Sequence, residues 1–219
     1  MIKLIVFDLD DTLYDCTGSI LYQGFDKAKK AMLDAGLDPK FIPLITELNK
    51  TMGFSDVIKI MKKKIPERIL KIGYNAIKNM EISGLKPFPD VIPTLKKIGI
   101  MKVLMSKGTA SLQRKKIEIL GLEDFFDDVF IVDQINTGEE KKDALNKILK
   151  KFNLKPENIM VVGDKIKNEI KDANQLGMVT VQMVHGKYSK VKPETEDEKP
   201  DYKIKKISDV LEILEKENR

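Results

Sequence analysis

The chain has 219 residues, enough for one hydrophobic core and a smaller additional unit. Its 39 basic and 34 acidic side chains leave a net charge of only +5, which gives no indication of nucleic-acid binding. No apolar run reaches the about 20 residues of a membrane span, the N-terminus lacks a signal-peptide pattern, and a single cysteine, Cys16, excludes an internal disulfide. We therefore expect a cytoplasmic protein, a monomer or small homo-oligomer, that binds neither nucleic acid nor membrane.

Five apolar runs of strand length predict a parallel sheet that is buried on both faces, because they show no polar alternation. They cover residues 2–7, 103–105, 129–132, 159–162 and 179–183. Amphipathic helical patterns separate the later runs, and we expect Gly99, Gly121 and Gly177 to end three of these helices. The alternation predicts an α/β fold, a doubly wound Rossmann-like parallel sheet whose ligands bind at the carboxyl ends of the strands.

The interval 19–83 interrupts this alternation with four helical periodicities and no strand. We interpret it as an inserted helical bundle, so that residues 1–15 and 86–219 form the core domain and residues 16–85 form a helical domain. Segment 187–200 is polar and contains two prolines, which predicts a loop before a last helix at about 207–214.

Three carboxylates follow the first predicted strand, at the edge where such a sheet binds ligands. They belong to Asp8, Asp10 and Asp11. Acids this close repel one another and raise one another's pKa unless a cation neutralises them, and oxygen ligands of this type suit Mg²⁺. The alternative is an acidic turn that caps the following helix.

The fourth run ends at Asp164, which the parallel topology places at the same edge as Asp8. A second source of carboxylate is what a Mg²⁺ site requires. The alternative is an ordinary strand-to-helix turn in which Asp164 caps the helix.

Two further strand ends offer groups that bind phosphate. The second run leads into Ser106, Lys107 and Gly108, where a hydroxyl and main-chain N–H groups can hold phosphate oxygens, although a serine N-cap is equally compatible. After the third run, Lys141 or Lys142 can supply an ammonium group to a charged transition state. Helix spacing favours Lys141, and Lys142 stays an alternative.

Together these sites resemble, in order and on the expected strands, the four motifs of the haloacid dehalogenase superfamily. The resemblance covers nearly the whole chain, and the helical insertion looks like a type 1 cap. The matching residues are Asp8 and Asp10 for the Asp-x-Asp motif, Ser106 for the Ser/Thr motif, Lys141 for the lysine motif, and Gly163, Asp164 and Glu169 for the acidic metal motif.

The resemblance implies a Mg²⁺-dependent phosphatase that acts on a small phosphorylated metabolite. Asp8 would attack phosphorus to form an aspartyl-phosphate, while Asp10 would serve as general acid and then as general base. Ser106 and Lys141 would stabilise the phosphoryl oxygens. The metal ligands would be Asp8, the main-chain carbonyl of Asp10, and Asp164.

Three residues depart from the usual family pattern, namely Lys107, Lys165 and Glu169. Among alternative functions, a dehalogenase would not need the general acid Asp10, and a non-catalytic phospho-ligand binding module would be expected to lose a motif acid. A phosphomutase would share every motif, so the sequence does not separate it from a phosphatase.

Overall fold

The computed structural model describes residues 1–219, which divide into two compact units. One unit comprises Met1–Cys16 and Gly84–Arg219, and the other comprises Thr17–Ser83. None of the helices combines the length and the apolar composition that a membrane crossing requires. Each unit is internally packed.

The larger unit contains a six-stranded sheet in the order β3-β2-β1-β4-β5-β6, and every neighbouring pair is parallel. The strands are β1 (Leu4–Phe7), β2 (Met101–Lys107), β3 (Asp128–Val132), β4 (Ile159–Gly163), β5 (Val179–Met183) and β6 (Tyr202–Ile204). Strand order reverses beside β1, where the crevice of a doubly wound sheet opens. The predicted doubly wound α/β fold is confirmed.

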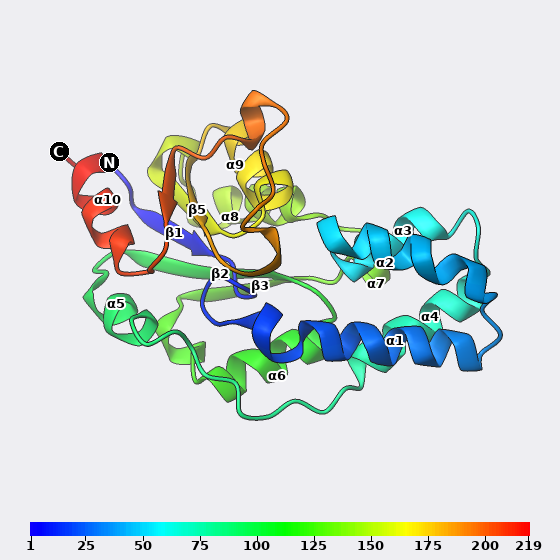
Figure 1. The fold of residues 1–219 in the computed structure, drawn as a ribbon. Coiled ribbons are helices and arrows are strands. Elements are labelled where there is room, and N and C mark those ends of the chain that lie inside the picture. Colours follow the sequence, from blue (N-terminus) through cyan, green and yellow to red (C-terminus); the bar gives the residue numbers. More distant parts are fainter. The chain divides into compact units, whose positions relative to one another are not determined.

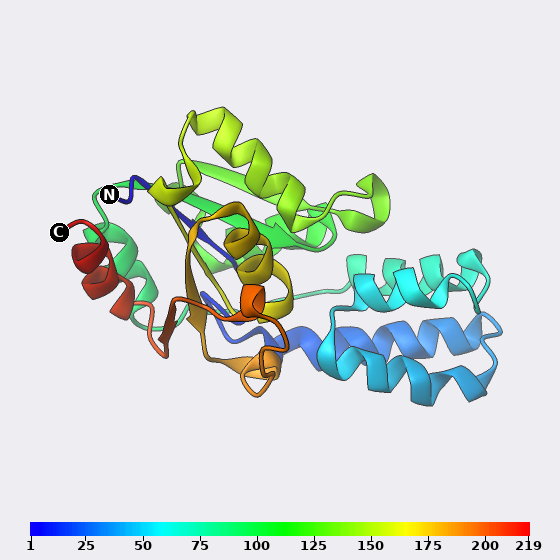
Figure 2. The ribbon, with the colours of Figure 1, turned by 90° about the horizontal axis from the view of Figure 1, so that it is seen from above.

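Helices cover both faces of this sheet, with α8 and α9 on one side and α5 and α6 on the other (Figures 1 and 2). The helices of this unit are α5 (Val91–Lys97), α6 (Ala110–Leu120), α7 (Gln134–Thr137), α8 (Lys141–Phe152), α9 (Lys171–Leu176) and α10 (Asp209–Glu217). A π-helical turn, Ile166–Ile170, precedes α9.

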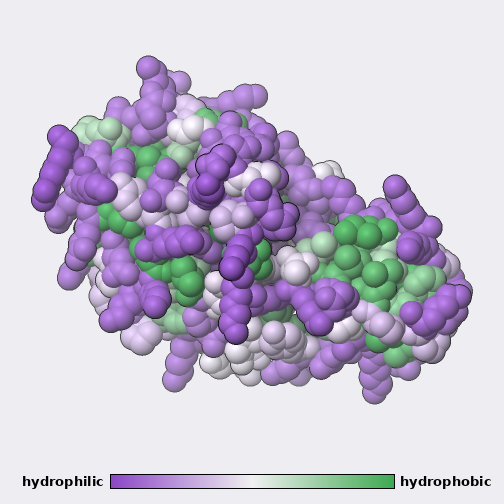
Figure 3. Space-filling view, turned by 45° about the horizontal axis from the view of Figure 1, so that its top comes forward, coloured by the Kyte–Doolittle hydropathy of each residue, from purple (hydrophilic) through white to green (hydrophobic).

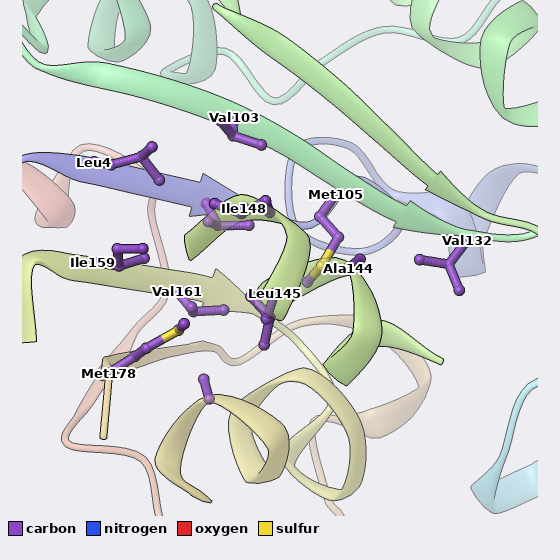
Figure 4. Packing of buried hydrophobic residues seen from close by; sticks show 12 residues of the cluster. Leu4, Val103, Met105, Val132, Ala144, Leu145, Ile148, Ile159, Val161 and Met178 are labelled. Carbon is purple, nitrogen blue, oxygen red and sulfur yellow. The ribbon is translucent and has the colours of Figure 1, made fainter. Parts of the chain in front are cut away.

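The core beneath α8 explains why β1 is apolar throughout. Leu4 and Val6 of β1 pack with Leu145 and Ile148 of α8 in one buried cluster (Figure 4). Successive side chains of a strand point to opposite faces, so Ile5 and Phe7 are buried on the other side of the sheet. The fully buried central strand therefore holds the residues at its carboxyl end in a rigid place.

Two details of the larger unit differ from the sequence prediction. Gly99 does not cap a helix, because α5 ends at Lys97 and the chain leaves through Ile98 in extended conformation. Gly121 and Gly177 do end α6 and α9 in the left-handed conformation that glycine favours. The short edge strand β6 was not predicted, since its three residues include the exposed Lys203 and form no apolar run.

The smaller unit is wholly helical, as predicted, with a π-helical turn at Thr17–Leu21 followed by four helices. These are α1 (Tyr22–Asp34), α2 (Ile42–Thr51), α3 (Phe54–Met61) and α4 (Glu67–Lys78). Helices α1 and α4 approach closely at Gly73, where an added Cβ would lie 2.8 Å from the Met32 side chain. Hydrophobic surface gathers on this unit in Figure 3, and Tyr22, Ile60 and Ile72 are among its exposed side chains.

Candidate active site

Three buried carboxylates meet at the carboxyl edge of the sheet. Asp8 follows β1 and donates its main-chain N–H to the Val162 carbonyl of β4 at 2.8 Å, so Asp164, which follows β4, lies beside it. One carboxylate oxygen from each of Asp8, Asp164 and Glu169 lies within 4.8 Å of the other two. Such a concentration of buried acids requires cations.

Lys141 supplies one of these cations. Its Nζ lies 2.6 Å from Asp8 Oδ1 and 2.9 Å from Glu169 Oε2, and all three side chains are buried. The lysine is the first residue of α8, whose start is fixed by a reciprocal capping box between Glu140 and Asp143. The helix start thus places the ammonium group beside the Asp8 carboxylate.

Lys142, the alternative to Lys141, points elsewhere. It donates from Nζ to Gln175 Oε1 at 2.8 Å in an exposed hydrogen bond. Successive helical residues differ by about 100° in direction, so only one of two adjacent lysines can face the sheet edge. The structure brings Lys141 to Asp8 and leaves Lys142 on the surface.

Glu169 is held from two sides. Besides the ion pair with Lys141, its Oε1 accepts the main-chain N–H of Lys165 at 2.9 Å. The Gly163 position leaves room for this side chain, because a Cβ there would lie 2.5 Å from Glu169 Cγ. Both carboxylate oxygens of Glu169 are thus in contacts within the protein, and these contacts hold the Lys141 side chain and the turn after β4 in place.

Burial and the neighbouring charges shift the pKa values of Asp8, Asp164 and Lys141. Burial raises the pKa of Asp8 against the opposing effect of Lys141, and burial raises that of Asp164 well above its usual value, with Lys165 opposing and Glu169 and Asp8 reinforcing. Burial would lower the pKa of Lys141, but Asp8 and Glu169 outweigh it and raise that pKa. Lys141 therefore stays positively charged. Its single charge does not offset the cost of burying both the Asp8 and the Asp164 carboxylates.

The donor set fits a divalent cation. Asp8 Oδ2 and both carboxylate oxygens of Asp164 are buried without a hydrogen-bond partner. Buried carboxylate oxygens are rarely left so, and hard oxygen donors at this spacing are the ligands of Mg²⁺. Asp8 and Asp164 can thus hold such an ion between them.

Asp10 lies in a different environment from Asp8. The chain turns sharply after it, with Asp11 in the left-handed conformation at φ 59°, and this turn returns the Tyr14 hydroxyl to Asp10 Oδ1 at 2.6 Å. Lys116 Nζ reaches both oxygens of Asp10, at 2.8 and 2.9 Å. Burial would raise the pKa of Asp10, but Lys116 and Tyr14 outweigh it and hold the carboxyl ionised.

Ser106 lies near the end of β2, which pairs with β1. Its Oγ accepts a hydrogen bond from Gln113 Nε2, and the same amide donates to Asp10 Oδ2 at 3.2 Å. A carboxylate only accepts hydrogen bonds, so the amide must turn its NH₂ group toward Asp10. The Ser106 hydroxyl, which accepts from Gln113, keeps its own proton for another acceptor.

The two residues after Ser106 have partners within the protein. Lys107 Nζ forms an ion pair with Glu140 Oε2 at 3.0 Å, and Gly108 donates its N–H to the Val132 carbonyl at 3.1 Å. Both residues stay predicted phosphate-binding groups of the strand end after β2.

Three residues that contact Asp10 were not predicted from the sequence, namely Lys116, Gln113 and Tyr14. A signal for Lys116 existed, because it lies four residues from both Leu112 and Leu120 and so interrupts the apolar face of α6 with a charge. A buried lysine on an apolar stripe needs an acidic partner. The sequence did not say which of the many acids that partner is.

Comparison with known proteins agrees with this geometry. A family model described as haloacid dehalogenase-like hydrolase matches residues 2–177. Glyceraldehyde 3-phosphate phosphatase from Methanocaldococcus jannaschii is 33% identical, covering 98% of this chain and 97% of that protein. The enzyme of the same name from Pyrococcus furiosus is 32% identical, covering 99% and 95%.

Solved structures share the fold. The crystal structure of a predicted phosphoglycolate phosphatase from Haemophilus somnus 129PT superposes with a TM-score of 0.71 at 20% identity, covering 97% of this chain and 98% of that one. The expected class of enzyme, a phosphatase of the haloacid dehalogenase type, is confirmed by the two sequence relatives, which match over nearly their whole lengths. The chain belongs to the haloacid dehalogenase-like hydrolase family.

Proposed function

We propose that the chain hydrolyses a small phosphomonoester in a Mg²⁺-dependent reaction, through an aspartyl-phosphate formed on Asp8. The single observation that carries this proposal is the state of the Asp8 carboxylate. Lys141 binds Oδ1, while Oδ2 is buried without a partner beside Asp164. A buried, oriented carboxylate with one free oxygen suits nucleophilic attack on phosphorus.

Asp8, Asp164 and the main-chain carbonyl of Asp10 are the groups that we expect to hold the metal. Two of the three lie at adjacent strand ends, and their unpartnered oxygens argue for a cation at this place. A bound Mg²⁺ would neutralise the acids and withdraw charge from the phosphoryl oxygens. Lys141 then adds a fixed positive charge on the opposite side of Asp8.

In the first half-reaction, an Asp8 oxygen forms a bond to phosphorus as the ester oxygen leaves, and Asp10 gives that oxygen a proton. In the second, Asp10 removes a proton from water, whose oxygen attacks phosphorus and releases phosphate and free Asp8. Asp10 is ionised in the free enzyme, ready for the second half. An anionic substrate favours its protonation for the first half, because nearby negative charge raises a carboxyl pKa.

Ser106 and Lys141 are suited to the transferring group. An ammonium has three N–H donors, and Asp8 and Glu169 use two of those of Lys141, so one is left for a phosphoryl oxygen. The Ser106 hydroxyl has its proton available in the same way. Fixed donors of this kind stabilise the charge that develops on the transferring phosphoryl group.

For the substrate, we propose glyceraldehyde 3-phosphate as the first compound to test, because the relatives from Methanocaldococcus jannaschii and Pyrococcus furiosus bear that activity in their names. The experiment measures phosphate release with Mg²⁺ from glyceraldehyde 3-phosphate, glycerol 3-phosphate, 2-phosphoglycolate and a hexose 6-phosphate. Release from the triose phosphate at the highest kcat/KM supports the proposal.

Two outcomes would contradict it. Phosphate release from none of the four compounds, with an isomerised sugar phosphate as product, would make the chain a phosphomutase. Preference for another compound in the panel would keep the phosphatase and reject the triose phosphate as its substrate.

A further inference from the structure

The buried face of α6 carries two polar side chains that the reaction described above does not use. Gln113 and Lys116 lie one helical turn apart, and both are buried, among Leu112, Ile117 and Leu120. Residues three apart share a helix face, so this pair points in one direction. That direction is toward Asp10 and Ser106.

Three donors from two segments fix the Asp10 carboxylate. Lys116 Nζ contacts both oxygens, Tyr14 donates to Oδ1, and Gln113 donates to Oδ2. The side chain of Asp10 keeps 18% of its surface exposed, whereas that of Asp8 keeps 3%. Asp10 is therefore held in place yet accessible from outside, as a group that exchanges protons with substrate and water must be.

Gln113 joins this arrangement to the phosphate-binding side. Its NH₂ group bridges Asp10 Oδ2 and Ser106 Oγ. Gly108 leaves space for the bridge, because a Cβ there would lie 3.0 Å from Gln113 Cδ. One face of one helix thus contacts both the proposed acid–base group and the proposed phosphoryl donor.

The Asp10–Lys116 pair is separate from the Asp8–Lys141 pair. Lys141 contacts Asp8 and Glu169, and Lys116 contacts only Asp10. Two neighbouring acids therefore have different lysines on different helices, α8 and α6. A lysine that served only to reduce the negative charge of the cluster would lie near Asp8, Asp164 and Glu169.

We infer that Lys116 and Gln113 are positioning residues, which hold the Asp10 carboxylate and orient the Ser106 hydroxyl for the two proton transfers of the reaction. This inference rests on the proposed function, since it presumes that Asp10 transfers the protons. The inference predicts that loss of Lys116 slows two steps that need Asp10. These are hydrolysis of the covalent intermediate and departure of leaving groups that must be protonated.

The test compares Lys116→Met with Lys116→Arg and with Lys115→Met, a matched change at the exposed lysine next to it. Each holoenzyme is mixed rapidly with Mg²⁺ and p-nitrophenyl phosphate, whose leaving group departs without protonation, and separately with glycerol 3-phosphate, whose leaving group needs a proton. Lys116→Gln, which keeps a polar side chain, carries the test if Lys116→Met does not fold.

We expect Lys116→Met to release about one p-nitrophenolate per active site in a burst, followed by turnover about 10- to 100-fold slower than wild type, with KM changed less than about threefold. The loss of kcat with glycerol 3-phosphate should be larger. Lys116→Arg should recover most of the rate because it keeps a cation beside Asp10, and Lys115→Met should match wild type.

An equal loss with both substrates and no burst, or wild-type kinetics in Lys116→Met, would overturn the inference. Asp8→Asn, measured beside these variants, separates this failure from that of the proposed function. If Asp8→Asn turns over p-nitrophenyl phosphate, the proposed nucleophile is wrong whatever Lys116 does. If Asp8→Asn is inactive and Lys116→Met is normal, only the positioning role is wrong.

Discussion

Lys141 Nζ lies 2.6 Å from Asp8 Oδ1, and both side chains are almost fully buried. The contact joins residues 133 positions apart, the end of the central strand and the first turn of α8. Removal of the lysine from such a buried cluster is costly, because Asp8 and Glu169 would lose the cation that both contact. The proposed mechanism places this pair at the reacting atoms.

Loss of the lysine should affect both activity and stability. We expect Lys141→Met to lower kcat by at least about 10²-fold, by analogy with the removal of one transition-state donor, and to destabilise the fold by about 3–5 kcal/mol. Phosphate release and thermal unfolding measure the two effects.

Lys142→Met is the matched control, since Lys142 is only half-buried and donates to Gln175 instead of Asp8. It should keep kcat within about twofold and stability within about 0.5 kcal/mol of wild type. A larger loss of kcat in Lys142→Met than in Lys141→Met would reverse the assignment of the motif lysine.

Asp8→Asn should abolish turnover, because the neutral amide is a poor nucleophile while the shape of the side chain is unchanged. The melting temperature should not fall, since the change removes one of three clustered acids. Phosphate release over hours detects the residual rate, and Asp124→Asn, at an exposed position, is the control. A kcat above one tenth of the wild-type value would refute Asp8 as the nucleophile.

The adjacency of Asp8, Ser106 and Asp164 could be predicted from the sequence because topology decides it. Each follows or ends a short apolar run without polar alternation, which predicts a strand of a parallel sheet, and such strands share one carboxyl edge. The main-chain register then brings Phe7 beside both Leu104 and Val162. For these three residues, the local strand pattern is therefore enough to predict their place in the folded chain.

The partners of Asp10 could not be predicted in the same way. Lys116 lies within a helix, and its ion pair depends on how α6 packs against the loop after β1, which no local periodicity encodes. The edge strand β6 was not predicted either. Tyr202–Ile204 forms a strand because it pairs with β5, and its composition does not indicate one.

Lys165 should weaken metal binding. Its ammonium lies 5.1 Å from the centre of the Tyr188 ring, and it opposes the burial-driven rise in the pKa of Asp8 and Asp164. It therefore repels a cation at those acids. We expect Lys165→Ser to lower the Kd for Mg²⁺ by roughly fivefold, from a repulsion on the order of 1 kcal/mol.

The dependence of the melting temperature on Mg²⁺ concentration, measured for both proteins at the same pH and ionic strength, gives this Kd. Lys155→Ser, an exposed change of equal charge, is the control for net charge. Weaker Mg²⁺ binding in Lys165→Ser than in wild type would mean that the lysine supports the site.

Without metal, Asp164 should make stability depend on pH. Its pKa is raised in the folded chain by burial, so the folded state binds the proton more tightly than the unfolded state. The sign follows from linkage: this contribution favours folding below the unfolded pKa of about 4 and is lost as pH rises through the folded pKa.

The free energy of unfolding of Asp164→Asn minus that of wild type, measured in chelator, isolates this contribution from those of Glu169 and Lys141. We expect the difference to grow from about pH 4 upward and to level off once Asp164 is ionised in the folded state. A difference that shrinks over this range would mean that burial does not raise the pKa of Asp164.

Mg²⁺ should stabilise the folded chain through Asp8 and Asp164, which hold buried oxygens without partners. Unfolding separates these like charges, so in metal-free protein they oppose folding, and a cation relieves the repulsion only in the native state. Linkage gives a stabilisation of about 2.7 kcal/mol when free metal is 100 times its Kd. The melting temperature measured by calorimetry at matched ionic strength should rise with Mg²⁺.

In Asp164→Ala this rise should shrink sharply, because one of the two proposed carboxylate ligands is gone, while the metal-free protein should be at least as stable as wild type. Asp172→Ala, which changes an acid on α9 outside the cluster, is the control and should keep the full Mg²⁺ effect. Ca²⁺ should raise the melting temperature of wild type as well, yet support turnover poorly because of its larger, looser coordination. Equal Mg²⁺ shifts in wild type and Asp164→Ala would exclude Asp164 from the metal site.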